Sequence, residues 1–525
     1  MGCSLAAGAA AGCAGLPVLD GRTQSQAAGD TGDTRLGRAL APRVAKHPGL
    51  SGILPLADSL DAFAARSLLA KAADRTLDVQ YYIWHDDISG TLLFGALREA
   101  AERGVRVRLL LDDHGSWGID EELAALDAHP NIEVRLFNPI VPRQVRMIGY
   151  LTDFSRTNRR MHNKSFTVDN QATIIGGRNV GDEYFGATRG VLFADLDVLA
   201  VGPVVQEVSA DFDRYWASGS AYPVERLLPA ATVSRLAELA GASARLEEDP
   251  AARDYLRRLR QSSFVGDLID DRLTIEWAPV RMVSDDPAKA LGEAGPEGNL
   301  THELWQIIGE PREKIDLVSA YFVPTQAGVD AFAAHVRRGV EVDILTNSLE
   351  ATDVAVVHAG YAKRRKDLLK AGVKLFELRL QHVLSRDEEA QAPHDAPAEK
   401  NAPAEPERSL VRGGSSGSSL HAKTFSVDSQ SVFVGSFNFD PRSIHLNTEL
   451  GFVIDSPLLA QRIRRQLEQQ LPWRAYRVVL SDDGKVYWLE RRGNEEVRHD
   501  VEPGTSAWLR AFVWFVSLLP IEWML

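Results

Sequence analysis

Residues 162–179 read HNKSFTVDNQATIIGGRN, and residues 421–438 read HAKTFSVDSQSVFVGSFN. Aligned on their first residue, the two stretches share His, then Lys two residues later, Asp seven later, Gly fourteen later and Asn seventeen later. Any one position agrees by chance about one time in twenty. Chance agreement at five positions in one register is therefore far less probable than the accidental match of a short motif. The chain therefore contains an internal repeat.

Each copy of the repeat is predicted to form a β-hairpin. After the His, apolar residues recur in two short runs, and polar residues typical of a turn separate the runs. Side chains two residues apart in a strand lie on one face, so His162 points the same way as Lys164, and His421 the same way as Lys423. Each pair can bind one phosphate group.

These residue types are the ones that reaction at a phosphodiester needs. The reaction requires a nucleophile, a proton donor for the leaving alkoxide, and positive or hydrogen-bonding groups for the oxygens on which charge develops. One imidazole can attack phosphorus to form a covalent phosphoenzyme, and a second, with an unperturbed pKa of about 6.5, can carry the proton. No metal and no cofactor is required. The predicted catalytic residues are His162, Lys164, Asp169, His421, Lys423 and Asp428, and the predicted phosphate-binding residues are Asn179, Asn438, Gly177 and Ser436.

Two further carboxylates are predicted to orient the histidines. A nucleophilic histidine needs an acceptor for its second ring nitrogen. Downstream of each motif lies a segment of similar build, and the two segments contain Asp195 and Glu449. We predict that these two residues orient the imidazoles. For Asp169 and Asp428 two roles stay open, because residues at hairpin turns either stabilise the turn or belong to the site.

The duplicated motif resembles that of the phospholipase D superfamily, His-x-Lys-x4-Asp-x6-Gly-Gly/Ser-x-Asn in two copies. The flanking residues 158–161 (NRRM) and 440–443 (DPRS) are similar to the bacterial cardiolipin synthase branch. The resemblance covers the chain from about Leu36 to the C-terminus. It implies that one motif histidine is the nucleophile and the other the general acid. In several family members the N-terminal histidine attacks, which would be His162.

The repeat extends to a β-α-β unit in each half of the chain. Strands predicted at 77–82 and 105–111 flank a helix with one apolar face, and strands at 315–322 and 340–345 do the same. We predict an α/β protein of two pseudo-twofold-related phospholipase D-like domains, each a mixed sheet flanked by helices, with one shared active site. The expected divisions are a first domain at 36–240, a connecting segment at 241–300, a second domain at 301–480 with a disordered Ala-, Pro-, Glu-, Gly- and Ser-rich insertion at 386–419, and a C-terminal segment at 481–525.

The overall composition limits the function. The 525 residues suit two domains, and the formal net charge is −13. Neutralising many nucleic-acid phosphates calls for a basic surface, so we expect no nucleic-acid partner, and the charge weakens a nuclease hypothesis. The cysteines are Cys3 and Cys13, so the rest of the chain can form neither disulfides nor thiolate metal sites.

Both termini carry membrane signals. Residues 1–22 begin small, apolar and uncharged, and the sequence before Cys13 resembles a lipoprotein cleavage box, which makes Cys13 a candidate lipid anchor. The box has Ala10 where a branched residue is usual, and the segment has no basic start, so a disordered terminus is the alternative. The apolar run 511–519 is shorter than the ~20 residues that span a membrane. With its three neighbouring tryptophans it is expected either to lie in the membrane interface or to pack on the protein's own core.

The leading functional hypothesis is phosphatidyl transfer in a membrane-associated enzyme of the bacterial cell envelope, with phospholipid substrates. A motif histidine would attack a phospholipid phosphorus, expel the headgroup alcohol and pass the phosphatidyl group to an acceptor. With phosphatidylglycerol as acceptor the product is cardiolipin, and with water it is phosphatidic acid. A phospholipase D-type nuclease and a non-enzymatic membrane-tethering module are the alternatives. His85, His114 and His335 match nothing in the repeat, and we expect them to be surface or packing residues.

Overall fold

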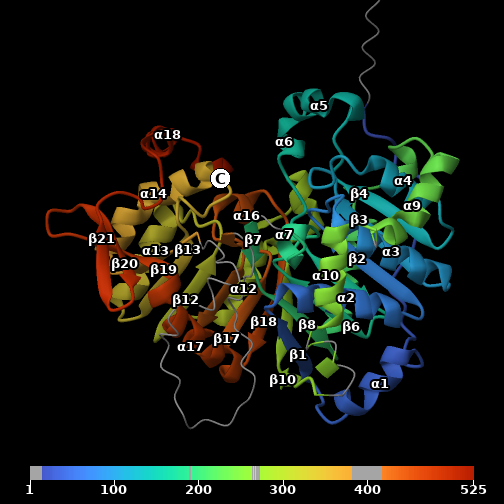
Figure 1. The fold of residues 1–525 in the computed structure, drawn as a ribbon, viewed down its shortest axis with the longest axis horizontal. Coiled ribbons are helices and arrows are strands. Elements are labelled where there is room, and N and C mark those ends of the chain that lie inside the picture. Colours follow the sequence, from blue (N-terminus) through green and yellow to red (C-terminus); the bar gives the residue numbers. More distant parts are fainter. Residues whose placement is uncertain are drawn as a thin grey trace, which may run out of the picture.

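The computed structural model describes residues 15–188, 191–246, 248–262, 264, 266–267, 272–380 and 417–525. The elements of the first half begin with a short helix and then alternate strands with helices (Figure 1). They are α1 (Arg35–Val44), β1 (Ser51–Leu56), α2 (Ser59–Ala72), β2 (Thr76–Tyr81), α3 (Ile88–Glu102), β3 (Arg106–Asp112), α4 (Asp120–Asp127), β4 (Ile132–Phe137), η1 (Arg143–Val145), α5 (Arg146–Thr152), α6 (Phe154–Thr157), β5 (Ser165–Val168), β6 (Ala172–Gly176), α7 (Asp182–Phe185), β7 (Val191–Ala194), β8 (Asp197–Val201), α8 (Val204–Ala217), β9 (Ala221–Pro223), η2 (Val224–Arg226), α9 (Val233–Leu246), α10 (Pro250–Arg260) and β10 (Glu276–Ala278).

The second half repeats the same alternation. Its elements are β11 (Val280–Ser284), η3 (Pro287–Leu291), η4 (Pro296–Gly298), α12 (Leu300–Ile308), β12 (Lys314–Ser319), α13 (Thr325–Arg337), β13 (Glu341–Asn347), α14 (Ala355–Lys370), β14 (Lys374–Leu378), β15 (Gly417–Leu420), β16 (Lys423–Val427), β17 (Ser431–Gly435), α16 (Pro441–His445), β18 (Leu450–Asp455), α17 (Pro457–Arg474), β19 (Ala475–Leu480), β20 (Val486–Arg492), β21 (Glu495–His499), α18 (Ala507–Ser517) and η5 (Glu522–Met524).

Two mixed sheets form the centre of the two halves. Their strand orders are β10-β1-β8-β6-β5-β2-β3-β4-β9 and β11-β18-β17-β16-β12-β13-β14-β19-β20-β21. In the first sheet β2 pairs parallel with β3 and antiparallel with β5; in the second, β12 pairs parallel with β13 and antiparallel with β16. The predicted β-α-β units, β2-α3-β3 and β12-α13-β13, are therefore confirmed, as are the two predicted hairpins, β5-β6 and β16-β17.

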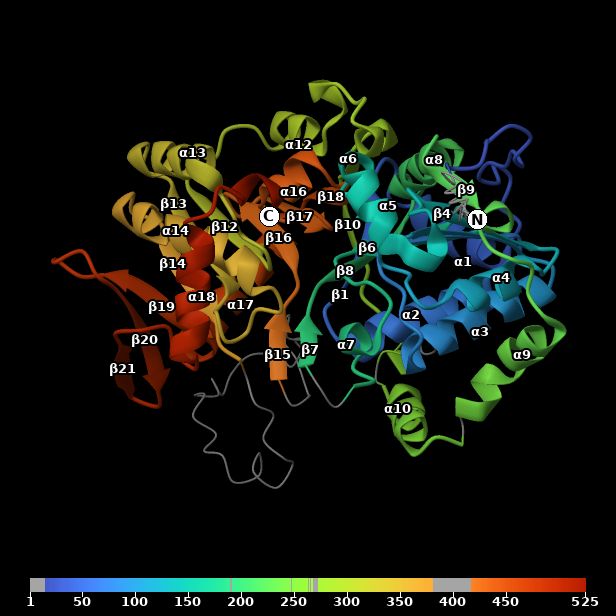
Figure 2. The same ribbon diagram turned by 90° about the horizontal axis from the view of Figure 1, so that it is seen from above.

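The two halves share a hydrophobic core. One cluster of buried residues contains Ile175 and Val198 from the first sheet and Val434 and Phe452 from the second, and all four are fully buried. A separate parallel pair of strands, β7 and β15, also joins the halves, and Figure 2 shows these two strands side by side between the domains. Because apolar burial across the seam stabilises the arrangement, residues contributed by both halves can be held in fixed geometry.

The domain divisions predicted from sequence need three corrections. The expected connecting segment contains β10, which pairs with β1, and β11, which pairs with β18, so the chain passes from one sheet to the other at Pro279. The second sheet continues beyond residue 480 through β20 and β21, because their hairpin pairs with β19. The predicted insertion extends too far, since Gly417–Leu420 forms β15; residues 386–416 lie outside the described residues.

The C-terminal segment forms α18, an amphipathic helix. Val513 and Val516 are buried in a small core with Leu349 and Ala359, which places α18 on α14. The opposite face exposes aromatic side chains, including Trp508 at 86%. Packing and exposure therefore occur on two faces of one helix. Among the helices that the structure describes, none combines the length and the apolar character needed to cross a bilayer. Cys13 lies outside the described residues, so its lipid modification stays a prediction.

Candidate active site

The two motif histidines lie at the seam, and each is held by the backbone of the other half. The His162 amide donates to the Thr448 carbonyl at 2.8 Å, and the His421 amide donates to the Ala194 carbonyl at 2.8 Å. The first contact extends the parallel bridge between Met161 and Thr448, and the second follows directly on the β7-β15 pair. Each histidine backbone is thus fixed only when both halves are in place.

The carboxylates that contact the histidines are exchanged between the halves. His162 Nδ1 lies 2.8 Å from Glu449 Oε2, and His421 Nδ1 lies 2.6 Å from Asp195 Oδ2. Both imidazoles are nearly buried, at 7% and 6% exposure. A carboxylate that orients a catalytic histidine makes this contact with Nδ1. Because each Nδ1 is engaged in this way, Nε2 is the ring nitrogen that remains for a substrate.

The two motif lysines turn back onto their histidines. Lys164 Nζ donates to the His162 carbonyl at 2.5 Å, and Lys423 Nζ lies 2.9 Å from His421 Nδ1 and donates to the His421 carbonyl. Burial lowers the pKa of both ammonium groups, well below its ordinary value for Lys164 and to about 8 for Lys423. The nearby carboxylates oppose this effect. With a pKa of about 8 the Lys423 ammonium is still largely charged at neutral pH, so it can offer positive charge to phosphate oxygens beside His421.

The electrostatics of the two halves are unequal. Burial, and then the positive charges of the lysines, lower the pKa of both imidazoles, and His162 lies well below its ordinary value. Burial opposes ionisation of Asp195, but the charges of His421 and Lys423 outweigh it and lower the pKa of this carboxyl to about 2. Burial instead raises the pKa of Glu449 to about 7. Among the described residues the second oxygen of this carboxyl, Oε1, is buried with no hydrogen-bond partner. His421 thus faces the more firmly ionised carboxylate.

The Gly177 and Ser436 positions explain part of this difference. A Cβ at Gly177 would lie 2.1 Å from Asp195 Oδ1, so glycine leaves room for that carboxylate. At the matching position Ser436 donates from Oγ to Glu449 Oε2 at 2.5 Å and accepts from the Leu450 amide at 3.1 Å. Both residues therefore help to position the two carboxylates, and phosphate binding by Gly177 and Ser436 stays a prediction.

The motif asparagines fix the loops that follow the central strands. Asn179 Oδ1 accepts from the Ile83 amide at 3.2 Å, and its Nδ2 donates to the Tyr184 hydroxyl at 3.0 Å. Asn438 Oδ1 accepts from the Tyr321 amide at 3.4 Å. These contacts orient both amides at the ends of β2 and β12. Phosphate binding by the asparagines stays a prediction.

Aromatic rings that the sequence reasoning missed surround the histidines. The ring centroids of Tyr82 and His162 are 5.1 Å apart, and Tyr184 and Phe193 each lie 5.1 Å from His421. Tyr321 lies under Lys423, with 6.0 Å from Nζ to the ring centroid. Tyr82 and Tyr321 follow equivalent strands of the repeat. A comparison of the two β-α-β units beyond the motif could have found these two tyrosines.

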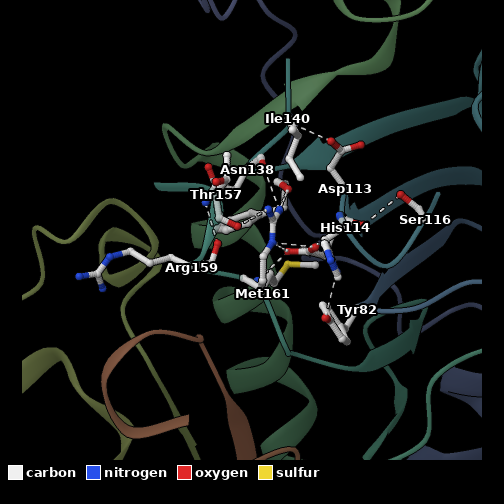
Figure 3. A network of polar contacts seen from close by, with 12 residues as sticks. Tyr82, Asp113, His114, Ser116, Asn138, Ile140, Thr157, Arg159 and Met161 are labelled. Atoms are coloured by element: carbon white, nitrogen blue, oxygen red, sulfur yellow. Dashed lines mark hydrogen bonds and ion pairs between the residues drawn. The ribbon is translucent and has the colours of Figure 1, made fainter. Parts of the chain in front are cut away.

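A buried network supports the backbone that leads to His162 (Figure 3). Arg160 Nε donates to both oxygens of Asp112 at 3.0 Å, and the Met161 amide donates to the same carboxylate at 2.8 Å. The His114 amide also donates to it at 2.8 Å, and the His114 ring lies 3.3 Å from the Tyr82 hydroxyl. His114 therefore lies beside the site, although it matches nothing in the repeat.

The motif aspartates lie at the hairpin turns, away from the histidines. Asp169 accepts hydrogen bonds from three consecutive amides, those of residues 74–76, at the start of β2, whereas the site lies beyond the end of that strand. Asp428 accepts from the amides of residues 312–314 before β12 in the same way. Both have a positive φ, 51° and 53°, as tight hairpin turns require. This corrects their assignment to the catalytic set, because they cap the strands that carry the site.

Alanine at Asp169 is expected to destabilise the fold rather than the chemistry. The change leaves three amides without their acceptor, which should cost roughly 2 to 4 kcal/mol of unfolding free energy. Asp482→Ala, on an exposed turn, is the control. Thermal unfolding and kcat of the folded fraction check this prediction. Loss of kcat with unchanged Tm would contradict the assignment.

The raised pKa of Glu449 makes stability depend on pH. Between the ordinary pKa of 4.5 and the folded value of about 7, the folded chain holds a proton that the unfolded chain has lost, so rising pH favours unfolding. The Tm advantage of the wild type over Glu449→Gln should shrink from pH 5 to pH 8, corresponding to roughly 2 to 3 kcal/mol. An advantage that grows with pH would show that Glu449 is stabilised in its charged form.

Among the described residues, one group of side chains outside the histidine site has metal-binding chemistry. Ligand atoms of His85, Asp87 and Glu183 lie within 4.8 Å of one another. These atoms already have partners, because His85 pairs with Glu183 at 3.2 Å and Asp87 accepts from the Gly90 amide at 2.9 Å at the start of α3. The geometry is accounted for by an ion pair and a helix cap.

Comparisons with known proteins agree with the duplicated architecture. The family model "Cardiolipin synthase, PLD-like domain" matches residues 66–216 and 304–471, and each match contains one histidine motif. The chain is 50% identical to cardiolipin synthase C of Escherichia coli K12 over 491 residues, 94% of this chain and 100% of that protein. It is 24% identical to cardiolipin synthase A of Pseudomonas entomophila, over 86% of this chain and 75% of that protein. The crystal structure of phosphatidylserine synthase from Haemophilus influenzae has the same fold, with a TM-score of 0.55, 14% identity and coverage of 94% of this chain and 100% of that one.

Proposed function

The chain belongs to the phospholipase D superfamily and to its cardiolipin synthase branch, and we propose that it makes cardiolipin through a covalent phosphohistidine. It is a phosphatidyltransferase of that family. The observation that carries the proposed mechanism is the exchange of carboxylates, His162 with Glu449 and His421 with Asp195. Two imidazoles oriented in this way can act on one phosphorus atom as nucleophile and as acid.

In the first step His162 attacks and His421 protonates. The lone pair on His162 Nε2 forms a bond to phosphorus, the bond from phosphorus to the headgroup oxygen breaks, and the Nε2 proton of His421 goes to the departing alkoxide. In the second step the acceptor hydroxyl gives its proton to His421 as its oxygen attacks phosphorus. The bond between phosphorus and His162 breaks, which restores both histidines. With phosphatidylglycerol as acceptor the product is cardiolipin.

The assignment of roles is supported by the charges around each ring. Burial lowers the pKa of both rings, and that of His162 lies well below its ordinary value, so His162 is the ring that stays neutral and nucleophilic. His421 faces Asp195, whose pKa is lowered to about 2, and an ionised carboxylate stabilises the imidazolium that an acid needs. Lys164 and Lys423 would stabilise the negative charge that develops on the nonbridging oxygens in the transition state.

Transfer to a lipid hydroxyl is favoured over hydrolysis by the surroundings of the site. The histidines are nearly buried, and Tyr82, Tyr184 and Phe193 pack against them. Such walls exclude water, which is the competing acceptor. Hydrolysis to phosphatidic acid is the second candidate, because the same phosphohistidine would react with any water that entered.

Incubation of the purified protein with labelled phosphatidylglycerol, with and without phosphatidylethanolamine, separates these candidates. Cardiolipin with release of the headgroup alcohol is the expected product. Phosphatidic acid as the main product would replace transfer by hydrolysis. Neither product, from protein that is folded by thermal unfolding, would contradict the proposal. A nuclease activity on single-stranded DNA in the same preparation would support the alternative that the charge of −13 disfavours.

Two features support attachment of the enzyme to the membrane of the cell envelope. They are Cys13, as a lipid anchor, and the exposed aromatic face of α18. Truncation of the C-terminal segment would remove the packing of α18 on α14. It would also remove the hydrogen bond that the Arg442 amide donates to the Leu525 carbonyl, so point changes are the cleaner test. Cys13→Ser and Trp508→Asp are each expected to reduce membrane pelleting from cells, and together to release most of the protein. Unchanged pelleting of the double variant would contradict both attachments.

A further inference from the structure

A second apolar surface lies on η1 and α5, far from α18 in sequence. Val145, Met147, Ile148 and Leu151 are 49%, 61%, 50% and 72% exposed. We call these four residues the α5 patch. A short surface helix with four solvent-exposed large apolar side chains is costly to hydrate, and such patches mark interaction sites.

The α5 patch is presented on a rigid support. Arg143 and Arg146 both reach under the helix to Asp113, which is fully buried, and to Asp120, with distances of 2.8 and 2.5 Å for Arg143 and 3.4 and 2.7 Å for Arg146. Gly149 lies so close to the Val141 carbonyl that a Cβ would be 2.1 Å away. The polar side of the segment is therefore docked on the domain while the apolar side faces solvent.

The α18 segment presents a matching surface from the other half. We call its exposed residues the α18 patch: Trp508, Phe512, Trp514, Phe515, Leu518 and Trp523. In Figure 1, α5 and α18 both project at the top of the molecule, one from each domain. The two helices that carry the patches therefore lie on one side of the protein.

Both patches connect to the histidine site through chains of side-chain contacts. From α5, ring contacts run from Tyr150 to His114, from His114 to Tyr82, and from Tyr82 to His162, with centroid distances of 6.4, 6.4 and 5.1 Å. From the other half, the Tyr321 hydroxyl donates to Asp353, which lies just before α14, the helix that carries α18.

The tail is also joined to the α5 side across the seam. Arg442 donates through Nη1 to Asn158 Oδ1 at 2.9 Å, and its amide donates to the carbonyl of Leu525. Arg442 lies four residues beyond the motif Asn438, so this link passes close to the site. The two patches and the histidines thus belong to one connected region.

We propose that the α5 patch and the α18 patch form one bilayer-binding face, so that a phospholipid enters the site between them without leaving the membrane. The inference rests on the proposed function for the identity of the lipid, but not for the binding itself. Tryptophans at the edge of an apolar surface are typical of the headgroup region. Arg143, Arg146 and Arg156 of this segment are paired with Asp113, Asp120 and Asp153, so the face would bind through its apolar side chains and tryptophans rather than through free positive charge. One bilayer surface can contact both patches and also supply the phospholipid to the site between them. A protein partner bound to one patch would do neither.

Vesicle flotation tests the α5 patch independently of turnover. All proteins are the full chain with Cys3→Ser and Cys13→Ser, which removes any lipid anchor. The test variant is Ile148→Asp with Leu151→Asp. The control is Leu458→Asp with Trp473→Asp, because these exposed residues lie on α17, away from both patches, and the added charge is equal. The partition coefficient onto vesicles of phosphatidylglycerol and phosphatidylcholine should be at least about tenfold lower for the test variant than for its parent. The control should have the partition coefficient of its parent.

A second measurement does not depend on how well the charged variant folds. A polarity-sensitive fluorophore on Ile148→Cys, in the same background, should shift to shorter wavelength on vesicle addition, as should one on Trp514→Cys, whereas one on Leu458→Cys should not. A shift at position 514 alone would overturn the two-patch face. So would equal partition of the test variant and its parent, or a dimer of the parent that the α5 change dissolves, since the patch would then bind a second copy.

Turnover separates this inference from the proposed function. The α5 variant should keep the parent's rate on a short-chain phosphatidylglycerol dissolved as monomers and lose rate on vesicles. Vesicle binding by a protein that makes neither cardiolipin nor phosphatidic acid would leave the face intact and remove the proposed chemistry. Loss of rate on the monomeric lipid would overturn the assignment of the patch to membrane binding.

Discussion

Alanine at His162 or at His421 is expected to lower phosphatidyl transfer by about 10⁴-fold or more. The first change removes the atom that bonds to phosphorus, and the second removes the proton that the leaving alkoxide needs. Each imidazole is held in place by its own carboxylate from the opposite half. The remaining histidine therefore cannot move over to replace the missing nucleophile or the missing proton donor. Initial rates of cardiolipin formation measure the effect, with His335→Ala on α13 as the control.

The double variant should be little worse than either single variant. Groups that act as a unit fail together, so their losses do not add. If the two single losses multiplied, the histidines would be acting independently, and the shared site would be wrong. Unfolding curves should resemble those of the wild type within the effect of one buried substitution for each single variant and of two for the double variant.

Asparagine at Asp195 is expected to lower turnover by about 10³ to 10⁴-fold. The neutral amide cannot stabilise an imidazolium on His421, and its NH₂ group can select the wrong tautomer of the ring. Glu449→Gln should cost less, because the pKa of Glu449 is raised to about 7 and this carboxyl is partly protonated at neutral pH.

The comparison of these two variants tests the unequal electrostatics of the halves. Asp195→Asn should also flatten the alkaline limb of the pH profile of kcat, which reports the acid in the bound complex. Equal losses from Asp195→Asn and Glu449→Gln, with identical pH profiles, would contradict the assignment of His421 as the acid. Ser436→Ala, which removes only the hydroxyl bonded to Glu449, is the milder control on the same side.

Local pattern was enough to predict the hairpins, the β-α-β units and the carboxylates that contact the histidines. It could not show that Asp195 serves His421 and Glu449 serves His162, because a periodicity within one half carries no information about contacts across a seam. The same limit applies to Ser436, whose hydroxyl looked available for phosphate until Glu449 was seen beside it. Short strands such as β10 and β15 were missed because their pairing partners, rather than their composition, make them strands.

The α5 patch was missed for a different reason. Its apolar residues lie between arginines, and in sequence such a segment reads as a partly polar loop or helix. Only the ion pairs of Arg143 and Arg146 with the buried Asp113 and the partly exposed Asp120 fix which side faces solvent. The structure thus adds orientation to residues that the sequence could already identify.

The most direct test of the central claim is to trap the phosphatidyl-enzyme. A phospholipid whose headgroup is a p-nitrophenyl group needs no proton on leaving, so the His421→Ala variant should still form the intermediate but pass it on slowly. Peptide mass spectrometry under neutral conditions should then find the phosphatidyl group on His162 in that variant, and find none in His162→Ala. A phosphatidyl group on His421, or turnover with no modified histidine in either variant, would contradict the account.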